Sequence, residues 1–215
     1  MLQMVLNGLP FLLEGAYYTL LLTVVSMTFG LLIGLVTAVA RLKGNRFIRW
    51  LARAYVSIIR GTPLLVQICI IYYGLVDYGV TLGSLTAAYI ALSVNAGAYL
   101  SETFRGAILS VPNGQMEAAL ATGMTPSQAM RRVVLPQAAR IAIPPMGNTF
   151  IGMLKETSLV SVITVSELLR QAQLLQSQTF VFMPYYIAIG IIYWLMSTGL
   201  SFLLERVEHR LARAY

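Results

Sequence analysis

Three charged side chains interrupt otherwise apolar stretches of the sequence: Glu102, Lys155 and Glu156. Inside a bilayer an ionisable group costs at least ~2.5 kcal/mol on insertion scales, so it usually faces a pathway or a partner. Adjacent residues of a helix point about 100° apart, which prevents Lys155 and Glu156 from pairing well with each other. The three residues could bind a zwitterionic ligand. They could equally form an interhelical ion-pair network, with Glu102 as a candidate partner for the other two.

Polar residues in the same stretches could line a cavity around these charges. They are Asn95, Tyr99, Asn148 and Thr149. The alternative is that they join helices to one another, as polar side chains in membranes often do. Pro144 and Pro145 are expected to disrupt the helix that contains Asn148. Because a broken helix at membrane depth is buried or lines water, the sequence predicts a cavity near Asn148.

Side chains for catalysis or metal binding are sparse. The chain has one histidine, His209, one aspartate, Asp77, and one cysteine, Cys69. A Ser/His pair, an aspartate pair or a zinc triad would need more of these residues close together, so the set required by an intramembrane enzyme is missing. The sequence therefore predicts no catalytic residue and no metal site.

The composition is that of a membrane protein. The hydrophobic fraction is 58% and the mean hydropathy is +0.75, which is more apolar surface than a soluble domain of 215 residues can bury. The sequence predicts one all-α membrane domain over residues 1–215. Within it, Gly30 and Gly34 are suited to close helix packing, either within the chain or across a dimer. Its five predicted spans are 11–40, 55–77, 82–109, 138–165 and 180–205.

The basic residues indicate which side is cytoplasmic. Thirteen of the 15 Lys and Arg residues lie in the tracts 41–60, 105–140 and 206–213. The positive-inside rule places these tracts in the cytoplasm, so the N-terminus is expected outside and the C-terminus inside. The loop at 110–137 is then cytoplasmic. Because the charge of +7 is spread between apolar runs rather than over one face, nucleic acid is not expected as a partner.

The cytoplasmic loop carries the most specific pattern. Its helix-forming residues, with a break at Gly123–Thr125 and Pro126 after the capping Thr125, predict two short helices. The string Glu117-Ala118-Ala119-x3-Gly123-x9-Val133-x-Leu135-Pro136 resembles the EAA motif of bacterial ABC importer permeases, with Val133 in place of isoleucine. Three further strings resemble the histidine/glutamine/arginine branch of that family: Arg60-Gly61-Thr62-Pro63, Glu102-Thr103-Phe104-Arg105-Gly106-Ala107 and Lys155-Glu156-Thr157-Ser158-Leu159.

The resemblance extends over residues 10–210 and implies a type I ABC importer-like permease of the bacterial inner membrane. It implies a polar amino acid as substrate. The negative charges of Glu102 and Glu156 favour a basic amino acid among these. The implied partners are a second permease subunit, identical or different, two nucleotide-binding ATPase subunits and an extracytoplasmic substrate-binding protein. The implied contacts to the ATPase are Glu117, Ala118, Ala119, Gly123, Leu135 and Pro136.

The ATP itself is expected on the partner subunit. This sequence has no Gly-x4-Gly-Lys-Ser/Thr phosphate loop, so no bound cofactor is expected. The alternative function is a self-sufficient secondary transporter or channel. The intramembrane charges would allow it, but the loop at 110–137 would then have no purpose.

Overall fold

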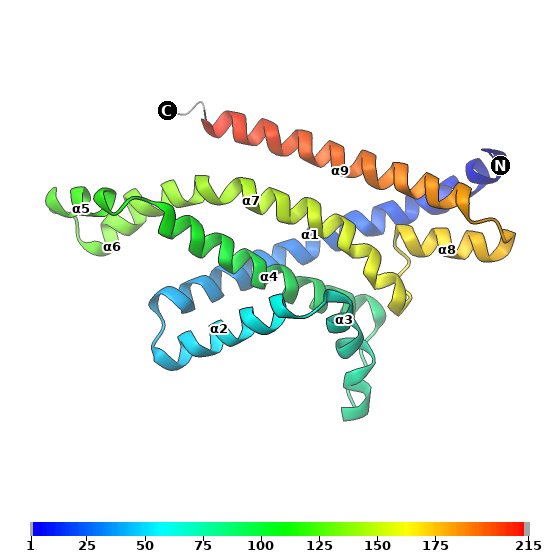
Figure 1. The fold of residues 1–215 in the computed structure, drawn as a ribbon, viewed down its shortest axis with the longest axis horizontal. Coiled ribbons are helices and arrows are strands. Elements are labelled where there is room, and N and C mark those ends of the chain that lie inside the picture. The colour runs from blue at the N-terminus through cyan, green and yellow to red at the C-terminus, as the bar shows by residue number, and fades with distance from the viewer. Residues whose placement is uncertain (1, 213–215) are drawn as a thin grey trace.

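The computed structural model describes residues 2–212, and helices form the regular structure of this part (Figure 1). Arg213, counted above in the basic tail, lies outside the described residues. The elements are α1 (Leu2–Lys43), α2 (Arg46–Gly61), α3 (Leu64–Tyr72), η1 (Gly74–Tyr78), α4 (Ser84–Ser110), α5 (Asn113–Ala121), α6 (Pro126–Ala129), η2 (Met130–Val134), α7 (Leu135–Glu156), η3 (Thr157–Ile163), α8 (Leu168–Thr179) and α9 (Met183–Ala212).

Two of the described helices are long and apolar enough to cross a membrane, Gln3–Lys43 and Met183–Arg210. The number rises to four if each of two bent helix pairs counts as one span. The remaining predicted span, 82–109, corresponds to α4, which is 27 residues long. Helix α9 turns large apolar side chains outward along its length, as a lipid-facing helix does. These exposed residues include Ile187, Ile191, Trp194, Leu195, Phe202 and Leu203.

Helices α1 and α4 pack closely through small residues. A Cβ atom at Gly30 would lie 2.6 Å from the Ala96 Cβ, and one at Gly34 would lie 2.8 Å from the Leu100 Cβ. The glycine pair therefore packs against α4 of the same chain, which decides between the two possibilities that the sequence left open. Small residues let two backbones approach closely, which helices in a membrane need for van der Waals contact.

The predicted span 55–77 is not one straight helix. Helix α2 ends at Gly61, and α3 and η1 turn away by 106° (Figure 1). Pro63 stands at the N-cap of α3, where its missing N–H breaks no hydrogen bond and its ring favours an extended residue before it. The Gln67 amide secures the bend by donating to the Ile59 carbonyl at 2.8 Å and the Thr62 carbonyl at 3.1 Å.

The expected disruption at Pro144 and Pro145 is wrong, because α7 runs unbroken from Leu135 to Glu156 and contains both prolines. Packing against α4 and α9 on its two sides outweighs the low helix propensity of proline. Gly147 also lies within this continuous helix. A Cβ at this position would collide with the Leu204 side chain, so Gly147 allows α9 to approach α7 closely.

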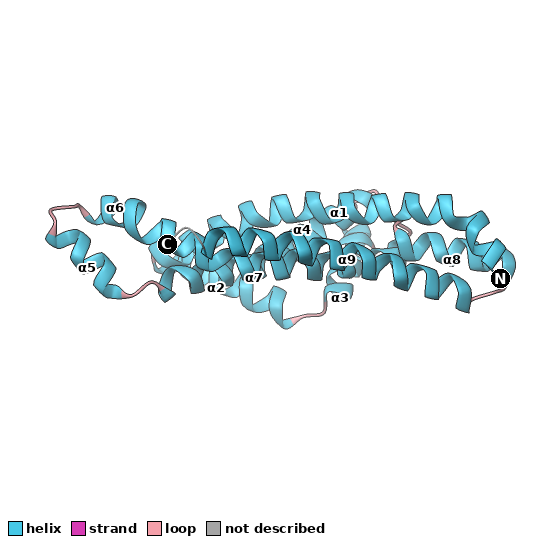
Figure 2. Ribbon diagram, turned by 90° about the horizontal axis from the view of Figure 1, so that it is seen from above, coloured by secondary structure: helices cyan, strands magenta, loops and turns pink. Residues whose placement is uncertain are grey.

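The chain gathers its basic segments at one end of an elongated molecule. The C-terminal part of α9 and the α5–α6 segment lie at this end, and the N-terminus and α8 lie at the other (Figures 1 and 2). Helices α1, α7 and α9 run along the long axis between the ends. In Figure 2 the α5–α6 segment extends beyond the rest of the bundle.

Candidate functional site

The loop predicted at 110–137 is a rigidly capped helical segment, which we call the coupling segment. Helix α5 ends in a turn closed by two backbone hydrogen bonds, from Gly123 N to Leu120 O at 3.0 Å and from Met124 N to Ala119 O at 3.2 Å. Gly123 has φ of +85°, a left-handed conformation that suits glycine and terminates helices. The predicted break at Gly123 is confirmed.

Helix α6 begins with a reciprocal cap. Thr125 Oγ1 accepts from Gln128 N at 3.3 Å, and Gln128 Oε1 accepts from Thr125 N at 2.9 Å. Pro126 occupies the first turn, where its missing N–H needs no partner. A short π-helical stretch, η2, then leads directly into α7. The predicted start of the second short helix at Thr125 is therefore confirmed.

Most of the residues that match the EAA pattern are on the surface. Glu117, Ala118 and Gly123 are exposed, as are Leu135 and Pro136 where the chain enters α7. Ala119 is different, because only 6% of it is exposed. One face of α5 thus packs against its own chain, while Glu117 presents a carboxylate to the outside.

A small apolar cluster anchors the coupling segment to the bundle. Its buried residues come from the end of α4, the residue that follows it, the end of η2 and the start of α7: Ala107, Val111, Val134, Ala138 and Ala142. Met116 of α5 and Met130 of η2 pack against them. A displacement of the coupling segment must therefore move the ends of α4 and α7 with it, because close-packed side chains transmit strain.

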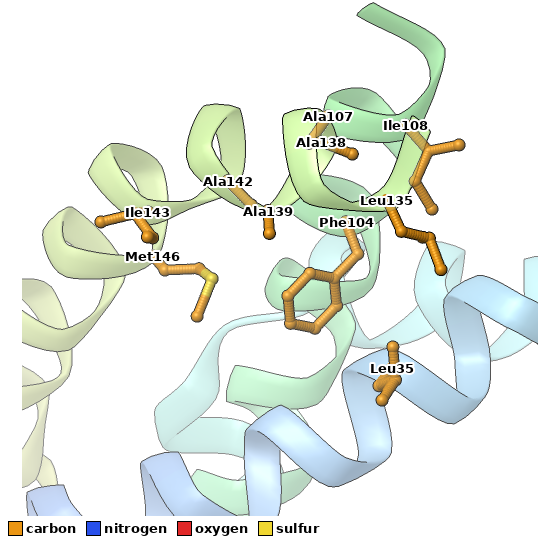
Figure 3. A pocket seen from close by; sticks show the side chains of 10 residues that line it. All are labelled: Leu35, Phe104, Ala107, Ile108, Leu135, Ala138, Ala139, Ala142, Ile143 and Met146. Carbon is orange, nitrogen blue, oxygen red and sulfur yellow. The ribbon is translucent and has the colours of Figure 1, made fainter. Parts of the chain in front are cut away.

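A cavity of about 330 Å³ lies beside this anchor, between α1, α4 and α7. Figure 3 shows Leu135, Phe104 and Leu35 pointing into it from three different helices. Its lining residues are Leu35, Phe104, Ala107, Ile108, Leu135, Ala138, Ala139, Ala142, Ile143 and Met146. All ten are apolar, so this cavity offers nothing that would bind a polar solute.

Glu102 is neutralised by arginines of its own chain. Its carboxylate accepts from Arg41 Nη1 at 2.5 Å and from Arg105 Nη2 at 2.8 Å, and Arg60 Nη1 lies 3.8 Å away. Within the part of the chain that the structure describes, Glu102 pairs with these arginines and not with Lys155, the candidate partner from the sequence. Helices α1, α2 and α4 converge here, and this position makes the arginines the nearer partners.

The two charges of α7 stand apart from that cluster. Lys155 and Glu156 are the last two residues of α7, and both are exposed. On the same helix Asn148 is exposed, and the Thr149 hydroxyl donates to the Pro145 carbonyl at 2.9 Å. Lys155 and Glu156 thus remain available to a ligand or to another subunit.

The two polar residues predicted on α4 differ from each other. Asn95 is buried and donates to Gln67 Oε1 at 3.1 Å, so its amide joins α4 to α3. Tyr99 is 43% exposed, and the Arg60 guanidinium lies 5.2 Å from its ring centre. Tyr99 is therefore the one of the pair that faces outward.

Sequence reasoning missed Glu167, which is fully buried at the start of α8. Its carboxylate accepts from Leu169 N at 2.9 Å, from Arg170 N at 2.8 Å and from the Tyr193 hydroxyl at 2.7 Å. The Thr19 hydroxyl accepts from the Leu168 N–H at 3.2 Å. Glutamate is not among the preferred N-cap residues, so no local pattern indicated this joint between α1, α8 and α9.

Residues 30–213 match the family described as "Binding-protein-dependent transport system inner membrane component". The chain belongs to this family. It is a multi-pass permease subunit of an ABC transport system in the bacterial inner membrane, and ATP is hydrolysed by a partner subunit. The resemblance inferred from the EAA-like string is confirmed.

Two permeases are similar in sequence to this chain over nearly its whole length. The L-cystine transport system permease protein TcyB of Bacillus subtilis (strain 168) is 47% identical over 95% of this chain and 88% of its own length. The glutamine transport system permease protein GlnP of Escherichia coli (strain K12) is 38% identical over 95% of this chain and 94% of its own.

A solved permease structure shows the same fold. It is described as "Crystal structure of an amino acid ABC transporter with histidines" and is 42% identical to this chain. The TM-score is 0.93, over 96% of each chain. The all-helical ABC permease fold expected from the sequence is therefore confirmed.

Proposed function

We propose that this permease forms half of the pathway of an ATP-driven importer for polar amino acids, and that residues 110–137 couple it to the ATPase. The observation that carries the proposal is the exposed, doubly capped coupling segment at one end of the molecule. In this proposal Glu117, Ala118 and Gly123 form the docking surface, and the buried Ala119 supports it from the face of α5 that packs against the chain itself. Leu135 and Pro136 form its connection to α7.

Helix α7 would carry the motion from the ATPase to the pathway. It runs without interruption from Leu135, beside the coupling segment, to Lys155 and Glu156. A helix of 22 residues spans about 33 Å, which is comparable to the hydrocarbon thickness of a bilayer. A rotation of the coupling segment would therefore displace the charged end of α7 on the far side of the membrane.

The substrate that fits these residues is a zwitterion. Lys155 and Glu156 offer opposite charges on successive residues of α7, and Tyr99, Asn148 and Thr149 add polar groups on α4 and α7. Because arginines neutralise Glu102, its charge is not available to favour a basic substrate. We therefore propose recognition of the α-amino and α-carboxylate groups common to amino acids. Asn95 is left out of this site, because its buried amide donates to Gln67 Oε1 at 3.1 Å.

The proposed assembly is a dimer of permease subunits, with an ATPase on each and a binding protein on the outer side. Each subunit would be one membrane domain with five spans, the second of them bent at Pro63. The ends of α1 and α9 that carry basic residues would lie in the cytoplasm with the coupling segment, and the N-terminus outside.

Transport assays in vesicles test the proposal. We expect Glu117→Lys and Gly123→Asp to abolish uptake while the subunit still inserts, because both alter the docking surface. Glu205→Lys is the matched control, since it reverses an exposed charge on α9 outside the coupling segment. Amino-acid flux carried by this chain alone, without an ATPase, would contradict the proposal and support a secondary transporter or channel.

The proposed substrate pathway is tested with variants other than those of the docking surface. We expect Glu156→Gln to alter uptake or the stimulation of ATP hydrolysis by loaded binding protein, since the zwitterion would lose one of its two charged partners. Glu14→Gln removes an exposed carboxylate elsewhere and should leave both rates unchanged. Unchanged rates in Glu156→Gln would assign this residue a role outside the pathway.

A further inference from the structure

Helix α2 carries four arginines on one side. Successive residues of a helix are rotated by about 100°, so Arg46, Arg49, Arg53 and Arg60 fall within a sector of about 60°. Arg60 is engaged near Glu102 and over the Tyr99 ring. The other three are exposed and form no ion pair with any residue between 2 and 212, although Arg49 Nη2 donates to the Gly44 carbonyl at 3.1 Å. We call Arg46, Arg49 and Arg53 the α2 arginine stripe.

A different face of α2 is apolar and exposed. Phe47 and Trp50 are 68% and 62% exposed, and their rings stack with centres 6.3 Å apart. Leu51 and Ile58 continue this face at 55% and 62% exposure. The helix packs on the bundle through a third face, which includes the buried Ala52 and Val56. The stripe and the apolar face are therefore both left uncovered by the chain's own helices.

This combination suits the cytoplasmic end of a membrane span, where a helix meets the lipid headgroups. An apolar face with Trp and Phe enters the boundary of the acyl chains, while Arg residues on the polar face reach the headgroups. Helix α2 begins after α1 ends at Lys43, and Asn45 Oδ1 caps it by accepting from Ile48 N at 2.9 Å. The stripe thus starts where a membrane-crossing helix has just left the bilayer.

We propose that the α2 arginine stripe binds the phosphate groups of anionic phospholipids, with Phe47 and Trp50 seated among the adjoining acyl chains. Charge complementarity selects this occupant. Each basic residue close to an anionic leaflet favours binding about fivefold, and three on one side of a helix act together. A guanidinium can also donate two hydrogen bonds to one phosphate. The bound lipids would hold the α1–α2 connection against the membrane.

Trp50 provides a direct probe of this contact. The chain has two tryptophans, so Trp194→Phe leaves Trp50 alone to report on α2. The permease, purified with its ATPase, is placed in phosphatidylcholine vesicles with a small fixed fraction of brominated lipid. We expect brominated phosphatidylglycerol to quench Trp50 severalfold more than the same fraction of brominated phosphatidylcholine, and high salt to reduce the difference.

Variants identify the residues responsible. The triple change of Arg46, Arg49 and Arg53 to Gln should remove the preference for phosphatidylglycerol, and each single change should reduce it only in part. The triple change to Lys keeps the charge and should retain most of the preference. Arg206→Gln with Arg210→Gln removes charge from the same end of the molecule but outside α2, and should have no effect.

Two results would overturn the proposal. Equal quenching by the two brominated lipids in the parent protein would show that anionic lipid is not enriched at α2. A triple Gln variant that keeps the parent's preference for brominated phosphatidylglycerol would show that the stripe does not bind the anionic lipid. Because fluorescence is read without transport, either result leaves the proposed importer function to be judged separately.

Discussion

The Arg41 guanidinium lies 2.5 Å from the Glu102 carboxylate and ties the end of α1 to α4. The side chains are 13% and 22% exposed, so water screens this pair only in part. The second carboxylate oxygen accepts from Arg105 Nε at 3.0 Å and from Nη2 at 2.8 Å. Glu102 is therefore the common acceptor that holds several guanidinium groups together.

Neutralising Glu102 should destabilise the permease. In Glu102→Gln the arginines lose their counter-charge, and hydrogen bonds to charged groups contribute about 1.5–3 kcal/mol each. We expect a lower midpoint of thermal unfolding in detergent, with Glu205→Gln as the control. A cycle of Arg41→Gln, Glu102→Gln and the double variant measures the coupling, and independent effects of the two changes would contradict the contact.

A side chain at Gly123 should strain the turn between α5 and α6. A left-handed conformation costs a non-glycine residue about 1–2 kcal/mol. We expect Gly123→Ala to speed hydrogen exchange at the amides of Gly123 and Met124 and to reduce transport. Gly114→Ala is the matched control, because Gly114 is helical and a Cβ there meets nothing within 4 Å. Identical exchange in the two variants would refute the strain.

A methyl group at position 147 should push α9 away from α7. Gly147→Ala places its Cβ against Leu204, and overpacking of this kind typically costs about 1–3 kcal/mol. Gly152→Ala on the same helix meets open space and should not destabilise the protein. In a Leu204→Ala background Gly147→Ala should have little effect. If Gly147→Ala still lowered the thermal stability in the Leu204→Ala background, the contact between the two residues would not be the cause.

Removing the charge of Glu167 should loosen the start of α8. A glutamine there keeps one acceptor oxygen but turns an amide N–H group toward a donor, which leaves a buried group unsatisfied at about 1–3 kcal/mol. We expect Glu167→Gln to lower the thermal midpoint and to increase hydrogen exchange at Leu169 and Arg170. Tyr193→Phe removes one donor and should have a smaller effect. Glu14→Gln, at an exposed position, serves as the control.

Local signals predicted the coupling segment well. The positive φ at Gly123 and the cap at Thr125 depend on residues within three positions of one another, so the sequence alone contains what determines them. The long apolar runs of α1, α4 and α9 were recognisable for the same reason. Bilayer thickness sets their length, whatever their neighbours are.

Features that depend on distant residues were not predictable. Glu102 is separated from Arg41 by 61 positions, and only the packing of α1 on α4 selects this partner over Lys155. The continuity of α7 through Pro144 and Pro145 likewise depends on neighbouring helices. The bend at Pro63 did have a local signal, but the apolar run on both sides of it suggested one straight span.

The contact at Gly147 has a mechanical consequence. Because no side chain separates α7 from Leu204 there, the two helices have no compressible layer between them. A displacement of the coupling segment that shifts α7 should then shift α9 by a similar amount, so that the two helices move as one unit. Both helices would then share the displacement at the cytoplasmic end. A single methyl group at position 147 would separate them and let α7 move before α9 follows.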